Sequence, residues 1–205
     1  MALNIVVFSS GSGSNFQAII DHIRDKSLDA KILAFICDNP QARAIERARA
    51  NQIPAYLFDA KKYPTREDYD LDIKKTIDSL KPDLIILAGY LKIIKSRELL
   101  SAYRHRILNI HPSLLPAFKG STNAQEEAFN HGCKVAGLTI HFVTEDVDGG
   151  QIIYQEAVDI SNCNSAEQVR EKILKCEHRA FSTVIQMFND CNFRIDGRRV
   201  IFEKK

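Results

Sequence analysis

Two polar residues that could stabilise a negative charge stand two positions apart at the end of an apolar segment. Asn109 and His111 end the segment Ile107 to His111, and Pro112 follows directly. Alternate residues of a strand point to the same face, so the amide and the imidazole project together. Both groups can donate a hydrogen bond to one oxygen on which charge develops. Two polar side chains in an apolar strand cost free energy unless they are hydrogen-bonded or have a function. A catalytic pair and a satisfied structural pair therefore both remain open.

A carboxylate that could act with His111 lies near the segment Asp146 to Gly150, with the sequence DVDGG. An aspartate before two glycines is commonly a turn residue. One carboxylate of Glu145, Asp146 or Asp148 could instead fold back, orient the imidazole and raise its pKa. The sequence contains no GxSxG motif, which argues against a serine hydrolase triad. Both interpretations of the turn stay open.

A third candidate site is the glycine-rich loop Ser9 to Ser14, with the sequence SSGSGS. A loop of small residues before a helix presents free backbone N–H groups to an anion at the helix N-terminus. The loop lacks the third glycine of a dinucleotide fingerprint and the Gly-Lys-Ser/Thr end of a P-loop. Three interpretations remain: a phosphate monoester site, a nicotinamide dinucleotide site, and a tight turn in which Ser14 caps the helix.

Alternating strands and helices must position these residues. The first part of the chain predicts a buried strand at Leu3 to Phe8 and further strands at Lys31 to Cys37, Pro54 to Phe58, Leu84 to Ala88 and Ile107 to His111. Helices are predicted from Asn15 onward, at Gln41 to Asn51 and at Arg66 to Leu80. The second part predicts helices at Asn123 to Asn130 and Ala166 to Phe188, strands at Val135 to Val143 and Gln151 to Ile160, and a hairpin at Phe193 to Phe202. The pattern predicts an α/β fold with a mostly parallel sheet, helices on both faces and antiparallel additions in the C-terminal part.

The composition narrows the class of protein. The 205 residues include 28 Lys and Arg against 26 Asp and Glu, so no general nucleic-acid or membrane partner is expected. No apolar run is long enough to span a membrane. Five widely spaced cysteines without a CxxC pair favour free thiols in a reducing cytoplasm and predict neither a disulfide framework nor a metal site. We find no linker and expect a single domain.

Four stretches together carry a family resemblance: NIVVFSSGSGSNFQAI, LIILAGYLKII, ILNIHPSLLPAFKG and LTIHFVTEDVDGGQII. In this order they resemble the folate-dependent formyltransferases over essentially the whole chain, and the members that act in purine biosynthesis most of all. The resemblance implies a Rossmann-like fold and transfer of a formyl group from 10-formyltetrahydrofolate to the amine of 5′-phosphoribosylglycinamide. The folate is a cosubstrate in this interpretation, and no cofactor is tightly bound. A monomer or a homodimer is expected.

The resemblance also implies roles for individual residues. Asn109, His111 and Asp148 match the catalytic residues, and His141 matches a histidine beside them. Asn109 and a protonated His111 would stabilise the tetrahedral intermediate, with Asp148 orienting the imidazole. The residues implied to hold the acceptor are Gly13, Ser14, Asn15 and Glu177. The residues implied to border the folate are Arg66, Leu91, Lys92, Ile93, Ile94, Asn109, Thr144 and Asp148. The Leu115–Pro116 bond is expected to be cis.

One segment departs from the family pattern. After Gly120 the chain reads STNAQEEAFNHG, with an extra residue and with Gln125 where a histidine is usual. No role is carried over from it. Within the single domain, 1–205, a phosphate-binding half of about 1–105 and a catalytic and folate-binding half of about 106–205 are expected. Alternatives are a formyltetrahydrofolate hydrolase, a sugar or tRNA formyltransferase, and a non-catalytic nucleotide-binding module.

Overall fold

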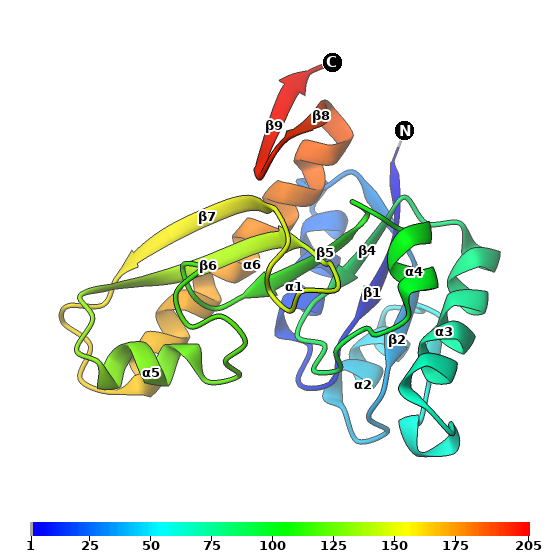
Figure 1. Cartoon of the computed structure of the whole chain (residues 1–205), viewed down its shortest axis with the longest axis horizontal. Helices are drawn as coiled ribbons and strands as arrows, with labels where there is room; N and C mark the ends of the chain where they lie inside the picture. The colour runs from blue at the N-terminus through cyan, green and yellow to red at the C-terminus, as the bar shows by residue number, and fades with distance from the viewer. Residues whose placement is uncertain (1) are drawn as a thin grey trace.

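The computed structural model describes residues 2–205, which are built around one nine-stranded sheet (Figure 1). The strand order is β3-β2-β1-β4-β5-β6-β7-β9-β8. The first five strands in the chain run parallel to one another, and the central ones are apolar segments, as a sheet covered on both faces requires. These strands are β1 (Leu3–Phe8), β2 (Ala30–Cys37), β3 (Ala55–Leu57), β4 (Leu84–Leu87) and β5 (Ile107–His111).

The last four strands extend the sheet with mostly antiparallel pairs. They are β6 (Val135–Phe142), β7 (Ile152–Asp159), β8 (Cys191–Asp196) and β9 (Arg199–Lys204). Strand β6 is antiparallel to β5 and to β7, and β8 and β9 form the predicted hairpin. The hairpin joins the sheet through a parallel pairing of Ile152 with Arg199. The predicted fold class, including the antiparallel C-terminal additions, is confirmed.

Helices cover both faces of the sheet, as the alternation of buried side chains in β1 requires. Ile5 and Val7 pack in a core with α1 (Ser14–Arg24), α2 (Arg43–Ala50) and α6 (Ala166–Asp190). Val6 and Phe8 pack in a second core with α3 (Arg66–Leu80) and α4 (Arg97–Ala102). The remaining helices are α5 (Ala124–Asn130), which contacts α6, and the short 3₁₀ helix η1 (Ala60–Lys62).

The longest helix, α6, places one acidic side chain within its buried face. Val169, Ile173, Ala180 and Val184 recur at helical spacing and are fully or almost fully buried. Glu177 lies in the same stripe and is only 6% exposed. A carboxylate in this position requires a partner or a function. None of the helices in residues 2–205 is both long enough and apolar enough to cross a membrane.

Three local features differ from the sequence-based predictions, and one of them is η1, which is too short for a periodicity to show. Helix α4 was not predicted, because its six residues are too few for a helical periodicity to show; the Ser96 hydroxyl caps it by accepting from the N–H of Leu99. The cap of α1 is Gly13, in a left-handed conformation with φ 67°, and the interpretation of Ser14 as the cap is wrong. The other predicted elements are present with ends shifted by at most two residues.

The carboxyl ends of the parallel strands bring the candidate residues to one edge of the sheet. Strand order reverses between β1 and β4, and ligands of open α/β sheets bind at such a point. The Ser/Gly loop follows β1, the segment Gly89–Ile94 follows β4, and Asn109 and His111 end β5. On the adjacent strand β6, His141 pairs directly with Asn109.

Candidate active site

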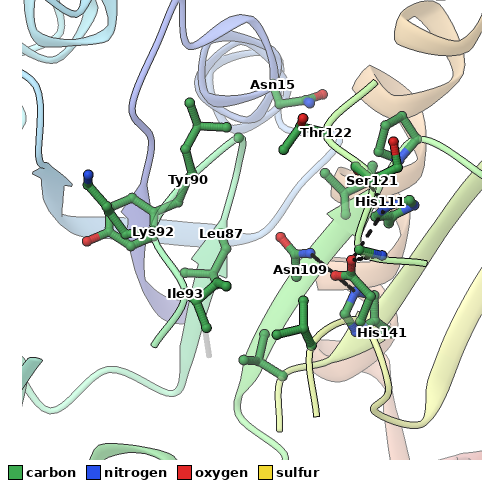
Figure 2. Close-up of a pocket in the computed structure, with 18 of the residues that line it drawn as sticks. Asn15, Leu87, Tyr90, Lys92, Ile93, Asn109, His111, Ser121, Thr122 and His141 are labelled. Atoms are coloured by element: carbon green, nitrogen blue, oxygen red, sulfur yellow. Dashed lines mark hydrogen bonds and ion pairs between the residues drawn. The ribbon is translucent and has the colours of Figure 1, made fainter. Parts of the chain in front are cut away.

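A cavity of about 480 Å³ opens where these segments meet (Figure 2). Residues far apart in the sequence line it, from the start of α1, the segment after β4, the end of β5, the loop before α5, strand β6 and helix α6. Of the residues predicted from the sequence, those that line the cavity are Asn15, Leu91, Lys92, Ile93, Ile94, Asn109, His111, His141, Thr144, Asp148 and Glu177. Gly13, Ser14 and Arg66 are not among the lining residues.

The carboxylate of Asp148 lies at the centre of the cavity, between the side chains of Asn109, His111 and His141. Its Oδ2 is 3.5 Å from Nε2 of His111, and its Oδ1 is 3.4 Å from both Nδ2 of Asn109 and Nε2 of His141. The backbone N–H of Gly120 donates to Oδ2 at 3.1 Å. Asp148 has a left-handed backbone with φ 50°, a conformation that costs energy in a non-glycine residue and is found at functional sites.

His141 is fixed behind Asn109 by a contact that the sequence did not reveal. Its Nδ1 is 2.9 Å from the carbonyl of Phe142, which can only accept, so this nitrogen carries the hydrogen. Its Nε2 lies 3.2 Å from Nδ2 of Asn109. The same nitrogen lies 3.4 Å from Oδ1 of Asp148, so His141 contacts both Asn109 and Asp148 and helps to orient them.

Burial and charge act against each other at His111. Burial is the largest influence and lowers the pKa of His111 below its usual value, while the carboxylate of Asp148 raises it by a smaller amount. Burial therefore disfavours the protonated His111 that the tetrahedral intermediate requires, and Asp148 offsets this effect in part. Burial raises the pKa of Asp148, but the hydrogen bonds from His141 and the Gly120 N–H, together with the charges of His111 and His141, outweigh it and leave this pKa below its usual value.

The end of the cavity next to α1 and α6 is polar. Nδ2 of Asn15 donates to Oε2 of Glu177 at 2.8 Å, whereas Oδ1 of Asn15 is buried and has no partner. Burial raises the pKa of Glu177 to about 7, and the hydrogen bond from Asn15 partly offsets this effect. Thr122, Gln125 and Arg170, which were not assigned from the sequence, also line the cavity.

The opposite end of the cavity is apolar and exposed. Leu91 and Ile93 are 73% and 51% exposed, which is unusual for large apolar side chains unless they meet a ligand or a partner. Lys92 lies beside them, with Nζ 4.0 Å from Oδ2 of Asp38. Figure 2 shows Lys92 and Ile93 across the cavity from Asn109 and His141.

Arg66 supports this apolar segment from behind. Its Nε donates to the carbonyl of Ile93 at 3.0 Å, and its guanidinium lies 4.2 Å from the centre of the Tyr69 ring. The buried carboxylate of Asp70 pairs with Arg66 at 3.4 Å and accepts from the N–H groups of Lys95 and Ser96. Arg66 therefore contacts the backbone of the lining segment rather than the cavity itself.

The altered segment after Gly120 closes one side of the site. The Ser121 carbonyl lies 3.2 Å from Nε2 of His111, and the Ser121 hydroxyl donates to Glu127. Nζ of Lys119 bonds both carboxylate oxygens of Asp146, which ties this loop to the turn that carries Asp148. The Leu115–Pro116 bond in the same loop is cis, as predicted. Within residues 2–205, no cluster of three or more His, Cys, Asp or Glu is arranged to hold a metal ion.

Gly13 is required by the fold itself, and replacement with alanine is expected to destabilise the protein. A Cβ at Gly13 would lie 2.6 Å from Cβ of Ala44 in α2, in addition to the cost of φ 67°. We expect Gly13→Ala to lower the free energy of unfolding by about 2 kcal/mol or more, measured by chemical denaturation. Gly11→Ala is the matched control, since a Cβ there meets no atom within 4 Å. Equal stability of the two variants would contradict this explanation.

Glu177 is expected to lower stability as the pH rises. The pKa in the folded protein, about 7, is above the ordinary value of 4.5, so between these values the folded state holds a proton that the unfolded chain has lost. The free energy of unfolding therefore falls across that window. We expect Glu177→Gln to equal the wild type at about pH 4 and to be more stable by about 2–3 kcal/mol at about pH 8, measured by denaturation at both pH values. A variant less stable than the wild type at the higher pH would show that the carboxylate is not strained by burial.

Comparison with known proteins agrees with this arrangement. The phosphoribosylglycinamide formyltransferase of Bacillus subtilis (strain 168) is 42% identical over 188 residues, which cover 92% of this chain and 95% of that protein. The protein of the same name from Escherichia coli (strain K12) is 35% identical over 205 residues, covering 97% and 96%. The crystal structure of glycinamide ribonucleotide transformylase 1 from Symbiobacterium toebii has a TM-score of 0.92 and 41% identity, and covers 98% of this chain and 94% of that one. A model described as formyl transferase matches residues 3–185, which include every cavity residue described above, and the chain therefore belongs to the formyl transferase family.

Proposed function

We propose that the chain transfers the formyl group of 10-formyltetrahydrofolate to the amine of 5′-phosphoribosylglycinamide, a step of de novo purine biosynthesis. One observation carries the proposal: Asn109, His111 and Asp148 meet at the centre of a cavity whose two ends differ in polarity. Transfer between two unlike substrates requires that each reach the same catalytic groups from its own side. The comparisons with phosphoribosylglycinamide formyltransferases support the same activity.

The polar end suits the acceptor. The first N–H groups of α1, at Ser14 and Asn15, have no partners within the helix and suit the phosphate, because a helix N-terminus favours an anion. The carboxylate of Glu177 can accept hydrogen bonds from the ribose hydroxyls, and the unpartnered Oδ1 of Asn15 offers another acceptor. Gly13 contributes by allowing the left-handed turn that aims these groups.

The apolar end suits the folate. Leu91, Ile93 and Ile94 offer apolar contacts to the flat pterin ring, and the backbone from Thr144 to Asp148 offers polar groups along its edge. In this proposal Arg66 holds the lining segment, and Lys92 supplies positive charge for the acidic tail of the folate. The folate acts as a cosubstrate that leaves after each turnover.

The chemistry follows from the positions of the three polar groups. The acceptor amine attacks the formyl carbon, and a tetrahedral intermediate with a negative oxygen forms. Asn109 donates an amide N–H to this oxygen. The neutral form of His111 takes the proton of the attacking amine and becomes a charged donor to the same oxygen. When the intermediate collapses, the bond between the formyl carbon and N10 of the folate breaks, and the imidazolium returns its proton to N10 of the leaving tetrahydrofolate. An imidazole suits this role better than Asp148, whose low pKa makes the carboxylate a weak base but a good partner for the imidazolium.

The phosphate requirement of the acceptor tests the proposal. We expect kcat/KM for glycinamide riboside, which lacks the phosphate, to be lower than for 5′-phosphoribosylglycinamide by roughly 100-fold, because the loss of charge-assisted hydrogen bonds costs about 3 kcal/mol. Steady-state assays with both acceptors at a fixed folate concentration provide the comparison. Equal efficiency with the two acceptors would exclude a phosphate site at α1.

A further inference from the structure

A buried hydroxyl contacts the edge of the His111 ring that points away from the cavity. Ser113 is only 2% exposed and does not line the cavity. Its Oγ is 2.9 Å from Nδ1 of His111 and donates to the carbonyl of Ala117 at 2.6 Å. Ser113 lies two residues after His111, in the turn that follows β5.

The position of the hydroxyl hydrogen determines which nitrogen of His111 is protonated. A carbonyl oxygen can only accept, so the single hydroxyl hydrogen of Ser113 points to Ala117. Oγ then presents a lone pair to Nδ1, and this nitrogen must carry a hydrogen to make the contact favourable. In the neutral ring the Ser113 contact favours the hydrogen on Nδ1, against the two acceptors that face Nε2, and so leaves Nε2 to exchange a proton with the cavity.

The second nitrogen faces the reaction. Nε2 of His111 is 3.5 Å from Oδ2 of Asp148 and 3.2 Å from the carbonyl of Ser121. The other titratable groups that act on the ring are His141 on β6, which disfavours its charge, and Glu127 on α5, which favours it. A proton that arrives at Nε2 finds two acceptors there, and the imidazolium is then hydrogen-bonded on both sides.

The turn that carries Ser113 is held in place from the neighbouring strands. The Thr139 hydroxyl on β6 donates to the Ser113 carbonyl at 2.7 Å and accepts from the N–H of Leu115 at 3.0 Å. Nε2 of Gln155 on β7 donates to the Leu115 carbonyl at 2.9 Å. These contacts keep the Ser113 hydroxyl facing Nδ1 rather than allowing it to turn away.

We propose that Ser113 is a positioning residue that keeps the hydrogen of neutral His111 on Nδ1, so that proton transfer takes place only at Nε2, toward the cavity. The proposal deepens the function given above and rests on it for its catalytic consequence. Without the hydroxyl, Nδ1 loses its acceptor, while Ser121 and Asp148 continue to offer acceptors to Nε2. The neutral ring then carries its hydrogen on Nε2, and its lone pair points away from the acceptor amine.

The tautomer can be measured without any substrate. We expect ¹⁵N chemical shifts of histidine-labelled protein to show the Nδ1–H form of neutral His111 in the wild type and the Nε2–H form in Ser113→Ala. The signal is assigned by its loss in His111→Ala. An Nε2–H tautomer in the wild type, or an unchanged tautomer in Ser113→Ala, would overturn the proposal, whatever the outcome of the formyl transfer assay.

Kinetics provide the second measurement. We expect Ser113→Ala to lower kcat by about 10- to 100-fold with both KM values nearly unchanged, and Ser113→Thr, which keeps a hydroxyl, to recover most of the loss. Ser182→Ala is the matched control, because the Ser182 hydroxyl is 2.8 Å from Nδ1 of His22, outside the cavity, and its removal should leave kcat unchanged. An unchanged kcat in a folded Ser113→Ala protein would overturn the proposal if the wild type transfers formyl groups. An inactive wild type would instead contradict the proposed function.

Discussion

Replacement of His111 with alanine is expected to lower kcat by roughly 10²- to 10³-fold or more, while the KM of each substrate changes little. The imidazole acts mainly in the transition state, where it takes the amine proton and then donates to the negative oxygen. A group that acts only there contributes to kcat rather than to substrate binding. Steady-state kinetics on protein whose fold is checked by circular dichroism measure the effect.

The control for His111→Ala is a histidine elsewhere on the protein. His131 is exposed and ends helix α5, and it does not line the cavity. We expect His131→Ala to retain wild-type kcat. A folded His111→Ala protein with nearly wild-type turnover would remove His111 from the mechanism.

Replacement of Asp148 with asparagine is expected to lower kcat to a similar extent, roughly 10²- to 10³-fold, with the fold retained. The amide removes the negative charge that favours the imidazolium of His111. One carboxylate oxygen is also replaced by an NH₂ group, which can only donate. Both oxygens face nitrogen atoms, of Asn109 and His141 on one side and of Gly120 on the other, so the new donor loses an acceptor's contact there. Asparagine tolerates a left-handed backbone better than most residues, so φ 50° is preserved.

A second aspartate in the same turn provides the control for Asp148→Asn. Asp146 pairs with Lys119 at an exposed position, and surface ion pairs contribute little. We expect Asp146→Asn to change kcat by less than about twofold. The pH dependence provides a further check: loss of the Asp148 charge removes an influence that raises the pKa of His111, so the pKa measured for His111 should fall. A pKa that is unchanged in Asp148→Asn would show that the carboxylate does not act on the imidazole.

Two residues of the candidate site could be placed together from the sequence because their geometry follows from simple periodicity. Asn109 and His111 share a face of β5 by the two-residue repeat of a strand, and the proline after them marks the end of that strand. The alternating strands and helices likewise predicted the sheet and its two covered faces. Asp148 was one of three carboxylates that could act on His111, and only the family resemblance selected it, since an aspartate before two glycines is equally typical of a turn.

Properties that depend on burial or on loop conformation could not be predicted in the same way. The lowered pKa of His111 arises from the burial of the ring, and no local sequence pattern predicts how deeply a ring is buried. The contact between Ser113 and His111 depends on the path of the turn after β5. Arg66 matched a folate-contacting residue, but its position behind Ile93 follows from how α3 packs against the segment after β4.

Simultaneous measurement of all products provides the most direct test of formyl transfer. Purified protein is incubated with 10-formyltetrahydrofolate and 5′-phosphoribosylglycinamide, and the formylated acceptor, tetrahydrofolate and free formate are quantified in the same reaction. We expect one formylated acceptor for each tetrahydrofolate formed, with no formate above the uncatalysed level. Formate release without formylated acceptor would indicate a hydrolase, and tight binding of the nucleotide without any product would indicate a binding module; either outcome would contradict the proposed transfer.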